Sequence, residues 1–160
     1  MAIDIFAKIG DIKGESQDAA FKDQIEVFSW SWGVSQTGSA SVGGGAGAGK
    51  ASFSDFSFVH NLDKASPNLF KACATGKHYP DATITARKAG EGQKEYLILK
   101  FYDLLISSVQ TGGSGGEDRL TENVSINFSQ VKVDYTEQAP KGAAAAKPKM
   151  GWDIAANKKI

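Results

Sequence analysis

Residues 107–135 read SSVQTGGSGGEDRLTENVSINFSQVKVDY, a glycine-rich turn between two runs of alternating apolar and polar residues. Side chains of a strand alternate between its two faces, so this pattern predicts a β-hairpin. Both runs change phase partway along. The residues that change from one parity to the other are Leu97, Leu99 and Phe101 then Leu104 and Ile106 on the outgoing run, and Leu120, Val124, Ile126 and Phe128 then Val131, Val133 and Tyr135 on the return run.

The matching phase changes indicate a bend that the two strands share. Folding the hairpin about Ser114 places Tyr102–Asp103 roughly opposite Ser129–Gln130. Facing irregularities bend two strands together, as at the corner of a barrel where one strand serves two walls. We therefore expect a mainly β fold, an antiparallel β-barrel built from two sheets, with one short side helix and an extended hairpin loop.

Composition favours a single domain over residues 1–160, because a chain of this length buries roughly 70% of its unfolded surface. Eighteen basic residues balance eighteen acidic ones, so the formal net charge is zero. Such a chain has no overall field to attract nucleic acid or an anionic membrane, and we expect neither nucleic-acid binding nor membrane insertion. It also has little net charge to oppose self-association.

The N-terminal stretch MAIDIFAKIGDIKGES holds Asp4 and Lys8 inside what would have to be an apolar segment, so we expect no signal peptide. Export would then need a route that reads no N-terminal signal. Cys73 is the only cysteine, which excludes an internal disulfide and a cysteine-rich zinc site. We expect no metal and no cofactor.

Residues 25–36 alternate between two contrasting faces and predict one strand. We expect an aromatic face against the core and a small, polar face pointing away from it. The expected core side chains are Phe28, Trp30, Trp32 and Val34, and the opposite face carries Ser29, Ser31, Gly33 and Ser35. The Trp30–Trp32 pair also resembles a sugar-stacking platform, although flanking apolar residues favour the core.

Residues 37–50, TGSASVGGGAGAGK, have almost no side-chain volume and cannot build a core. On these residues alone we favour a flexible hairpin loop over a dedicated contact arm. Gly44, Gly49 and Lys50 fit a phosphate-loop spacing, but Ala51 stands where that loop needs a hydroxyl. A strand pattern follows instead of the required helix, so nucleotide binding is excluded.

Helix signals bracket the segment NLFKACAT. Ser66 is a suitable N-cap, Pro67 fits the first helical position and Gly76 fits the C-terminal stop. The expected buried stripe consists of Leu69, Phe70, Cys73 and Ala74. Cys73 is therefore interpreted as a small core residue and not as a nucleophile.

Two terminal segments complete the expected organisation. Residues 2–9 predict a half-buried strand whose outer face carries Phe6, which needs a cover. Residues 141–149 are interpreted as an Ala- and Lys-rich linker to a final strand, MGWDIA, in which Met150, Trp152 and Ile154 share one face.

Candidate catalytic residues are few. His60 and His78 have no acid or thiol partner at catalytic spacing in the sequence, so a structural or surface role is favoured for both. The charged cluster after the glycine turn, Glu117, Asp118, Arg119 and Glu122, is interpreted as a solvated face. From the residues alone, a self-assembling structural β protein ranks first, a β-barrel binding module for carbohydrate or protein second, and an enzyme a distant third.

The hairpin sequence TGGSGGEDRLTENVSINFSQVKVDY resembles the corresponding segment of Hcp, the family that forms the inner tube of type VI secretion systems. The resemblance continues through KIGDIKGES, SWSWG, SPNLFKACATGKHYP, RKAG, EYLIL and GWDI, at residues 8–16, 29–33, 66–80, 87–90, 95–99 and 151–154. It implies a tube protein without catalytic residues. Its implied partners are six-membered rings of the same chain that stack, a contractile sheath, a capping spike protein and effector proteins in the lumen.

The resemblance also suggests where contacts would lie. A similar extended loop in the family makes the side-chain-poor segment a candidate to reach the next ring: Val42, Gly43, Gly44, Gly45, Ala46, Gly47 and Ala48. In a ring, strand alternation would turn Ser29 and Ser31 toward the bore, with Ser114 as an additional candidate. The implied location is the bacterial cytoplasm, followed by export to the extracellular space or a target cell without a cleaved signal peptide.

Overall fold

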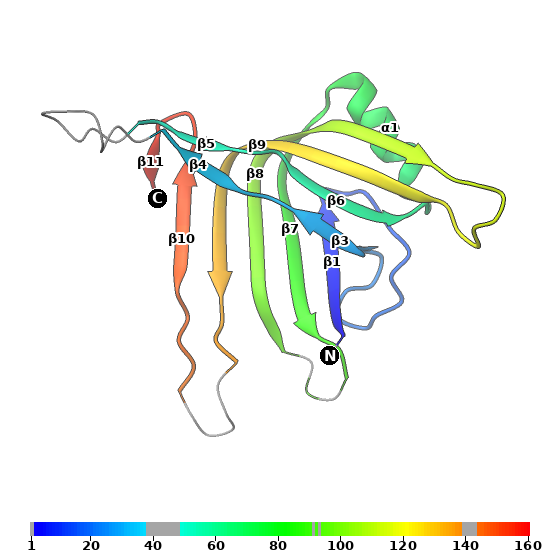
Figure 1. Cartoon of the computed structure of the whole chain (residues 1–160), viewed down its shortest axis with the longest axis horizontal. Coiled ribbons are helices and arrows are strands. Elements are labelled where there is room, and N and C mark those ends of the chain that lie inside the picture. Colours follow the sequence, from blue (N-terminus) through cyan, green and yellow to red (C-terminus); the bar gives the residue numbers. More distant parts are fainter. Residues whose placement is uncertain (1, 38–48, 91, 93, 139–143) are drawn as a thin grey trace, which may run out of the picture.

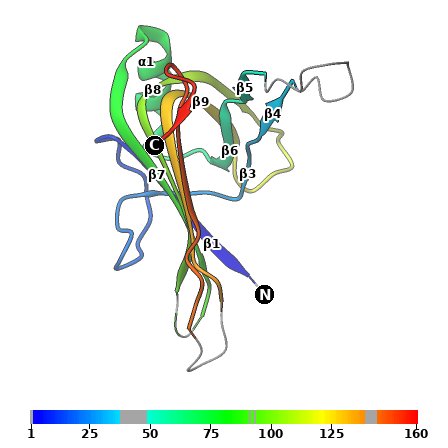
Figure 2. The ribbon, with the colours of Figure 1, turned by 90° about the vertical axis from the view of Figure 1, so that its left-hand side faces the viewer.

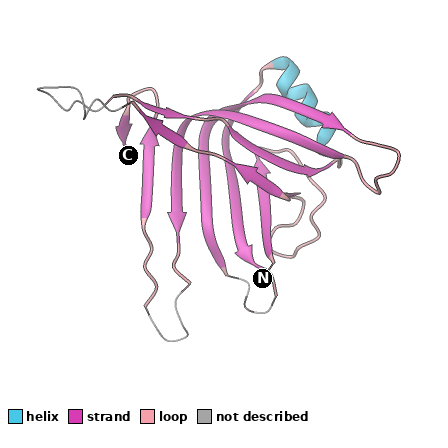
Figure 3. Ribbon diagram, in the orientation of Figure 1, coloured by secondary structure: helices cyan, strands magenta, loops and turns pink. Residues whose placement is uncertain are grey.

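The structure, a computed structural model, describes residues 2–37, 49–90, 92, 94–138 and 144–160. These residues form a mainly antiparallel β fold with one short helix, as predicted (Figures 1 and 3). The elements are β1 Ile3–Ile9, β2 Ile25–Glu26, β3 Ser29–Ser31, β4 Val34–Gln36, β5 Ala51–Phe53, β6 Phe56–Asn61, α1 Ser66–Thr75, β7 His78–Lys88, β8 Glu95–Gly112, β9 Thr121–Tyr135, β10 Lys149–Asp153 and β11 Lys158–Lys159.

The hairpin of β8 and β9 carries the bend that the phase change predicts. Asp103 adopts a positive φ of 49°, and the Ser129 hydroxyl opposite it donates to the Asp103 carbonyl oxygen at 3.2 Å. Burial changes parity on both strands at this point, from Leu99 and Phe101 to Leu104 and Ile106 on β8, and from Val124, Ile126 and Phe128 to Val131 on β9. A second irregularity, between Ile106 and Ser108, adds to the curvature.

The strands curve around a common core. The larger sheet has the order β11-β10-β9-β8-β7-β1-β2, and the first half of β9 also pairs with β6, which pairs with β3. The short link between β2 and β3 connects β1 to β6, since Val27 N–H donates to Ile5 O at 2.9 Å and Phe28 N–H donates to Val59 O at 2.8 Å. Backbone hydrogen bonding therefore continues around the barrel. Figure 1 shows how the strands curve.

Aromatic side chains fill the barrel. Phe101 lies between Phe56 and Phe128, with ring centroids 5.0 Å and 4.6 Å away. Trp30 stacks on Phe56 at 5.6 Å, and Trp32 contacts Phe101 edge-on at 5.6 Å. Offset and edge-to-face pairs of this kind add to the stabilisation that burial alone provides.

The segment expected to be one strand over residues 25–36 is instead broken into β2, β3 and β4, which corrects the prediction. Trp30 and Trp32 do pack against the core, but Phe28 and Val34 are 56% and 59% exposed. Phe28 lies in the link that bonds to two different strands. Val34 begins the small β4–β5 ribbon, which projects from the barrel (Figure 2).

The helix ends where the sequence predicts but begins one residue earlier, and its buried face differs from the expected one. Gly76 has a φ of 67° and provides the left-handed C-cap. The N-cap is Ala65, and the Ser66 hydroxyl instead accepts the Asp63 N–H at 3.1 Å. The buried residues of α1 are Ser66, Leu69 and Ala72, whereas Phe70 and Ala74 are exposed and Cys73 is only half-buried. The helix thus packs on β8 with its face turned from the expected one.

The predicted cover for Phe6 comes from the loop after β1. Phe21 stacks on Phe6 with ring centroids 4.5 Å apart, and the Arg87 guanidinium lies 5.0 Å from the centre of the Phe6 ring. At the other end of the chain, the residues before β10 continue the pairing with β9, because Tyr135 N–H donates to Pro148 O at 3.1 Å. Trp152 and Ile154 pack against the core as expected, but Met150 is exposed.

Candidate functional site

A row of four serines crosses the wall made by β3, β6, β9 and β8. Ser31 pairs with Ser57, Ser57 with Ser125, and Ser125 with Ser108. The hydroxyls of Ser57 and Ser125 lie 2.7 Å apart and share a hydrogen bond. We name these four residues the serine row. They lie on the face opposite the buried Phe58 and Val124, because side chains alternate along each strand.

Neighbouring outward positions extend the serine row into an uncharged surface, here named the polar wall. It consists of Ser29, Ser31, Ser57, Val59, Ser108, Gln110, Asn123, Ser125 and Asn127. None of these side chains ionises. At its margin the Asp55 carboxylate accepts hydrogen bonds from the Ser107 hydroxyl at 2.7 Å and the Asn127 amide at 2.9 Å. The polar wall therefore offers mainly small, neutral hydrogen-bonding groups, with one carboxylate, Asp55, at its margin.

The predicted site residues are distributed unequally over this surface. Ser29 and Ser31 are exposed on β3, within the polar wall. Ser114 lies beyond the last paired residues of the hairpin, in a turn where its carbonyl accepts the Glu117 N–H at 3.1 Å. The structure thus places Ser29 and Ser31 together in the polar wall and Ser114 apart from them. The expected ring-contact segment, residues 42–48, lies outside the described residues.

Ser57, Ser108 and Ser125 belong to the polar wall but were not singled out from the sequence. Ser57 and Ser125 occupy outward positions in alternating runs, so the signal for their exposure was present. Ser108 instead shares the parity of the buried Leu104 and Ile106, so alternation alone would place it inward. What the sequence lacks is the register that aligns β6 between β3 and β9. The bulge between Ile106 and Ser108 also moves Ser108 into line with Ser125.

The buried polar groups of the barrel form a structural pair. His60 Nε2 lies 2.8 Å from Glu122 Oε1, and both side chains are fully buried. Glu122 is therefore not part of a solvated face, because β9 turns it inward opposite His60. Burial lowers the pKa of His60, but the carboxylates of Asp63 and Glu122 outweigh this effect, and the pKa of His60 is raised above its ordinary value.

The second histidine lies at the surface. His78 Nδ1 is 3.4 Å from Asp103 Oδ1, and both side chains are well exposed. Solvent screens such a pair strongly, so it contributes little to stability. Within the described residues, no group of three or more His, Cys, Asp or Glu side chains is arranged to hold a metal ion.

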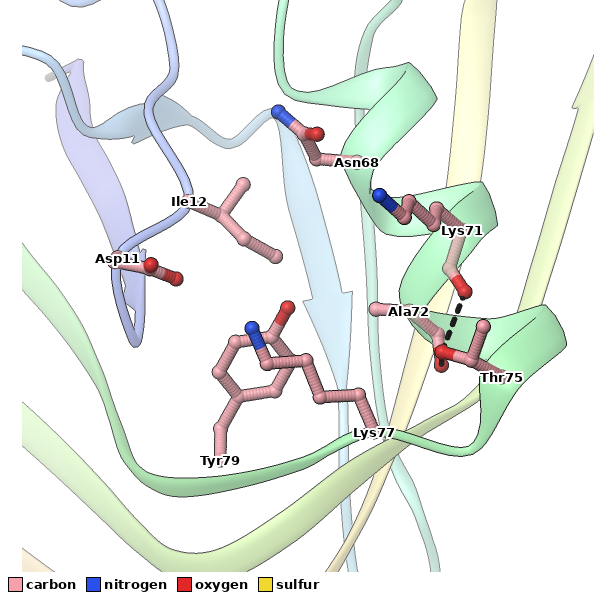
Figure 4. A pocket seen from close by; sticks show the side chains of 8 residues that line it. All are labelled: Asp11, Ile12, Asn68, Lys71, Ala72, Thr75, Lys77 and Tyr79. Atoms are coloured by element: carbon pink, nitrogen blue, oxygen red, sulfur yellow. Dashed lines mark hydrogen bonds between the residues drawn. The ribbon is translucent and has the colours of Figure 1, made fainter.

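A shallow pocket of about 200 Å³ lies between α1 and the turn after β1 (Figure 4). Two of its polar side chains have partners within the protein. The Thr75 hydroxyl donates to the Lys71 carbonyl at 2.8 Å, and the Lys77 ammonium lies 4.9 Å from the centre of the Tyr79 ring. This arrangement contains no paired nucleophile and base.

The tryptophans that suggested a sugar platform are engaged with the core. Trp30 stacks on Phe56, and Trp32 contacts Phe53, Phe101 and Phe128. Both side chains are only partly accessible. Their role in packing removes the feature that favoured carbohydrate binding.

The described part of the chain contains no helix both long and apolar enough to cross a membrane.

Comparisons with known proteins agree with this architecture. The family described as "Type VI secretion system effector, Hcp" matches residues 6–135. The chain is 57% identical over 159 residues to Protein hcp1 of Pseudomonas aeruginosa, with 98% of each chain covered. It superposes on Hcp1 from Salmonella typhimurium with a TM-score of 0.83 at 43% identity and complete coverage of both chains.

A further solved structure, described as a type six secretion system protein, superposes with a TM-score of 0.92 at 30% identity. It covers 99% of this chain and is itself covered completely. The fold and these relatives define a structural, secreted β protein of type VI secretion. The chain belongs to the Hcp family, which is not a family of enzymes.

Proposed function

We propose that this chain is the tube subunit of a type VI secretion system, that it assembles as stacked hexameric rings, and that the polar wall lines the bore. Membership of the Hcp family supports the first part. The serine row supports the third part, the lining of the bore, because it is a continuous uncharged surface over four strands. Repetition around a ring would turn it into a smooth, hydrophilic lining.

The chemistry of the polar wall suits a guest that must be held loosely and then released. A hydrogen bond between neutral groups replaces one to water, so each contact contributes only about 0.5–1.5 kcal/mol net. Neither a deep pocket nor a charged clamp fixes the guest on the polar wall. Many weak contacts would retain an effector protein in the bore without making its release slow.

The remaining parts of the proposal follow the same assembly. Residues 42–48 would reach the next ring, since β4 and β5 on either side of this segment pair as a ribbon that projects from the barrel. Contraction of a surrounding sheath would expel the tube beneath a spike protein. The chain would thus begin in the bacterial cytoplasm and leave by type VI secretion.

The experiment introduces bulk into the polar wall. Ser31→Tyr adds a large side chain at an exposed position, so the fold and the ring should persist while effector retention falls. Asn68→Tyr, at an exposed position of α1, is the matched control. Each variant is co-expressed with an effector, and ring content, co-purified effector and effector abundance are measured. Unchanged retention by Ser31→Tyr rings would place the bore elsewhere, and a monomeric wild-type protein would contradict the assembly.

A further inference from the structure

A row of lysines crosses the outer face of the large sheet, over β1, β7, β8 and β9. Lys8 of β1 is in register with Thr83 of β7, and Thr83 is in register with Lys100 of β8. Lys100 in turn lies directly opposite Lys132 of β9. All three lysines are exposed. We name Lys8, Lys100 and Lys132 the basic row, and Figure 1 shows its strands side by side.

This placement of like charges costs the fold stability. Like charges directly opposite each other on antiparallel strands are destabilising, and Lys100 and Lys132 are such a pair. Among the described residues, no lysine of the basic row forms an ion pair with a carboxylate. The Lys132 ammonium lies 5.7 Å from the centre of the Tyr102 ring, which orients its charge without neutralising it. The rows on either side hold the acids of this face, Asp81, Asp134 and Asp153. An arrangement that opposes the local fold without compensation points to a function.

The basic row and the polar wall face in opposite directions. Both use β8 and β9, but on opposite sides of the bend at Asp103. The aromatic core lies between the two surfaces, since Phe101 beneath the basic row contacts Phe56 beneath the polar wall, with ring centroids 5.0 Å apart. In the proposed ring the basic row therefore points away from the bore, where a molecule outside the tube can reach it. Only this placement rests on the proposed function, because the basic row is a property of the single chain.

We propose that the basic row binds an acidic α-helix of a second protein, which lies across the strands. Neighbouring strands are about 4.8 Å apart, so Lys100 and Lys132 lie about 10 Å and about 14 Å from Lys8 along the row. A helix rises about 1.5 Å per residue, so carboxylates about seven and ten positions after the first match both spacings from one face. An extended peptide matches less well, because its side chain about 10 Å along points to the opposite face.

The strength of this contact depends on repetition. Each ion pair at such an exposed surface contributes little to affinity and is weakened by salt, so a single copy of the chain should bind the helix weakly. Identical subunits that each present the basic row would bind a repeated partner far more tightly, because the effective concentration rises. A nucleic acid suits the surface less well than a short acidic helix, since the chain as a whole has zero net charge.

The test uses a synthetic helix-forming peptide with glutamates at the three matching positions, and a control peptide in which the same glutamates are spread around the helix. A carbodiimide joins a carboxylate to a lysine amine that touches it, so mass spectrometry of the crosslinked full chain at low salt maps the contact. We expect the matched peptide to crosslink to Lys8, Lys100 and Lys132, and the control peptide to crosslink at scattered lysines.

Binding of the labelled matched peptide is then compared between two variants by fluorescence anisotropy. Lys100→Glu with Lys132→Glu should bind about tenfold more weakly than the wild type, because repulsion replaces two ion pairs. Lys71→Glu with Lys94→Glu, at exposed positions outside the basic row, changes the net charge equally and should bind as the wild type does. Thermal unfolding curves verify that each variant is folded.

Lys132→Glu alone separates binding from folding. It places opposite charges across the strands in place of like ones, so the melting temperature should stay the same or rise while peptide binding falls. A lower melting temperature would show that Lys132 serves the fold and would overturn the inference.

The remaining outcomes distinguish other occupants of the surface. Crosslinks spread evenly over the exposed lysines, or equal losses of affinity in the two double variants, would overturn the inference. Tighter binding of a single-stranded DNA oligonucleotide or of phosphatidylserine vesicles than of the matched peptide would also overturn it. All of these results leave the proposed function intact, whereas a wild-type chain that forms no ring would overturn the proposed function and not the binding.

Discussion

His60 on β6 and Glu122 on β9 are partners across the register of the two strands, with 2.8 Å between Nε2 and Oε1 and both side chains fully buried. Asp63 Oδ2 lies 3.7 Å from the other ring nitrogen. The paired carboxylates favour the protonated imidazole, which is why the pKa of His60 is raised although burial opposes it. Asp63 lies in the segment that leads into α1, so its contact with His60 connects that segment to the wall that carries the serine row.

Because of this pair, the stability of the protein should fall as the pH rises. A raised pKa in the folded state means that the stabilising contribution is complete below the unfolded value of about 6.5 and is lost as pH rises through the folded value. We expect the free energy of unfolding to decrease over this range. Urea titrations at a series of pH values measure it, and a free energy that rises with pH there would contradict the assignment.

Removing one partner should cost far more than removing a surface histidine. We expect Glu122→Ala to lose about 3–5 kcal/mol at pH 6, because a buried charge is left without its partner. His78→Ala, at an exposed ion pair, should change stability by less than about 0.5 kcal/mol. If denaturant titrations give equal changes in the free energy of unfolding for the two substitutions, the buried pair contributes no more to stability than the exposed one.

The hydrogen bonds between Arg87 and Asp18 predict how the stability of the protein falls at acid pH. Arg87 donates to both oxygens of Asp18, and this hydrogen bonding holds the pKa of Asp18 below its usual range. The resulting stabilisation is present above the unfolded value of about 3.9 and is lost as pH falls through the folded value. Asp18→Asn should lower stability at neutral pH and weaken the acid dependence. An unchanged acid limb in circular dichroism titrations would refute this role.

The aromatic core should tolerate truncation poorly. Phe101 is fully buried among Phe56, Phe128 and Trp32, so Phe101→Ala should destabilise the protein by about 3–5 kcal/mol through lost burial and a cavity. Phe28→Ala removes a largely exposed ring and should cost much less. Chemical denaturation of both variants at low protein concentration tests the difference, since it excludes any contribution from subunit contacts.

Cys73 should react with a thiol reagent at an intermediate rate in the native state. It is half-buried against the core and not enclosed by it. The rate should therefore fall between that of a fully accessible thiol in denaturant and that of a protected one. Labelling with a chromogenic disulfide reagent measures both conditions. Complete protection until global unfolding would support the fully buried stripe that the helix pattern predicted.

The hairpin was predictable because alternation and its phase change lie within one continuous stretch. The alternation within residues 99–106 and 124–133 shows which side chains are buried, and its phase change predicts the bend at Asp103. The breaks in residues 25–36 were not predictable in this way. Phe28 fits the aromatic pattern, but its backbone bonds to β6 while Val27 bonds to β1, a contact between segments far apart in the sequence.

The site was predictable only in part for the same reason. Alternation places Ser29 and Ser31 on an outward face, and the structure agrees. The alignment of Ser57, Ser125 and Ser108 with them depends on strand register and on a bulge, which single-sequence patterns do not encode. Glu122 was misassigned because its charged neighbours suggested a turn, whereas pairing with His60 brings it inside.

The most direct measurement of the central claim is a cryo-electron microscopy reconstruction of the assembled full-length chain at a resolution that shows side chains. We predict a hexameric ring with the serine row, Ser31, Ser57, Ser125 and Ser108, facing the bore of every subunit. A ring in which these four residues face outward or lie within a subunit contact, or an assembly that contains no ring, would contradict the account.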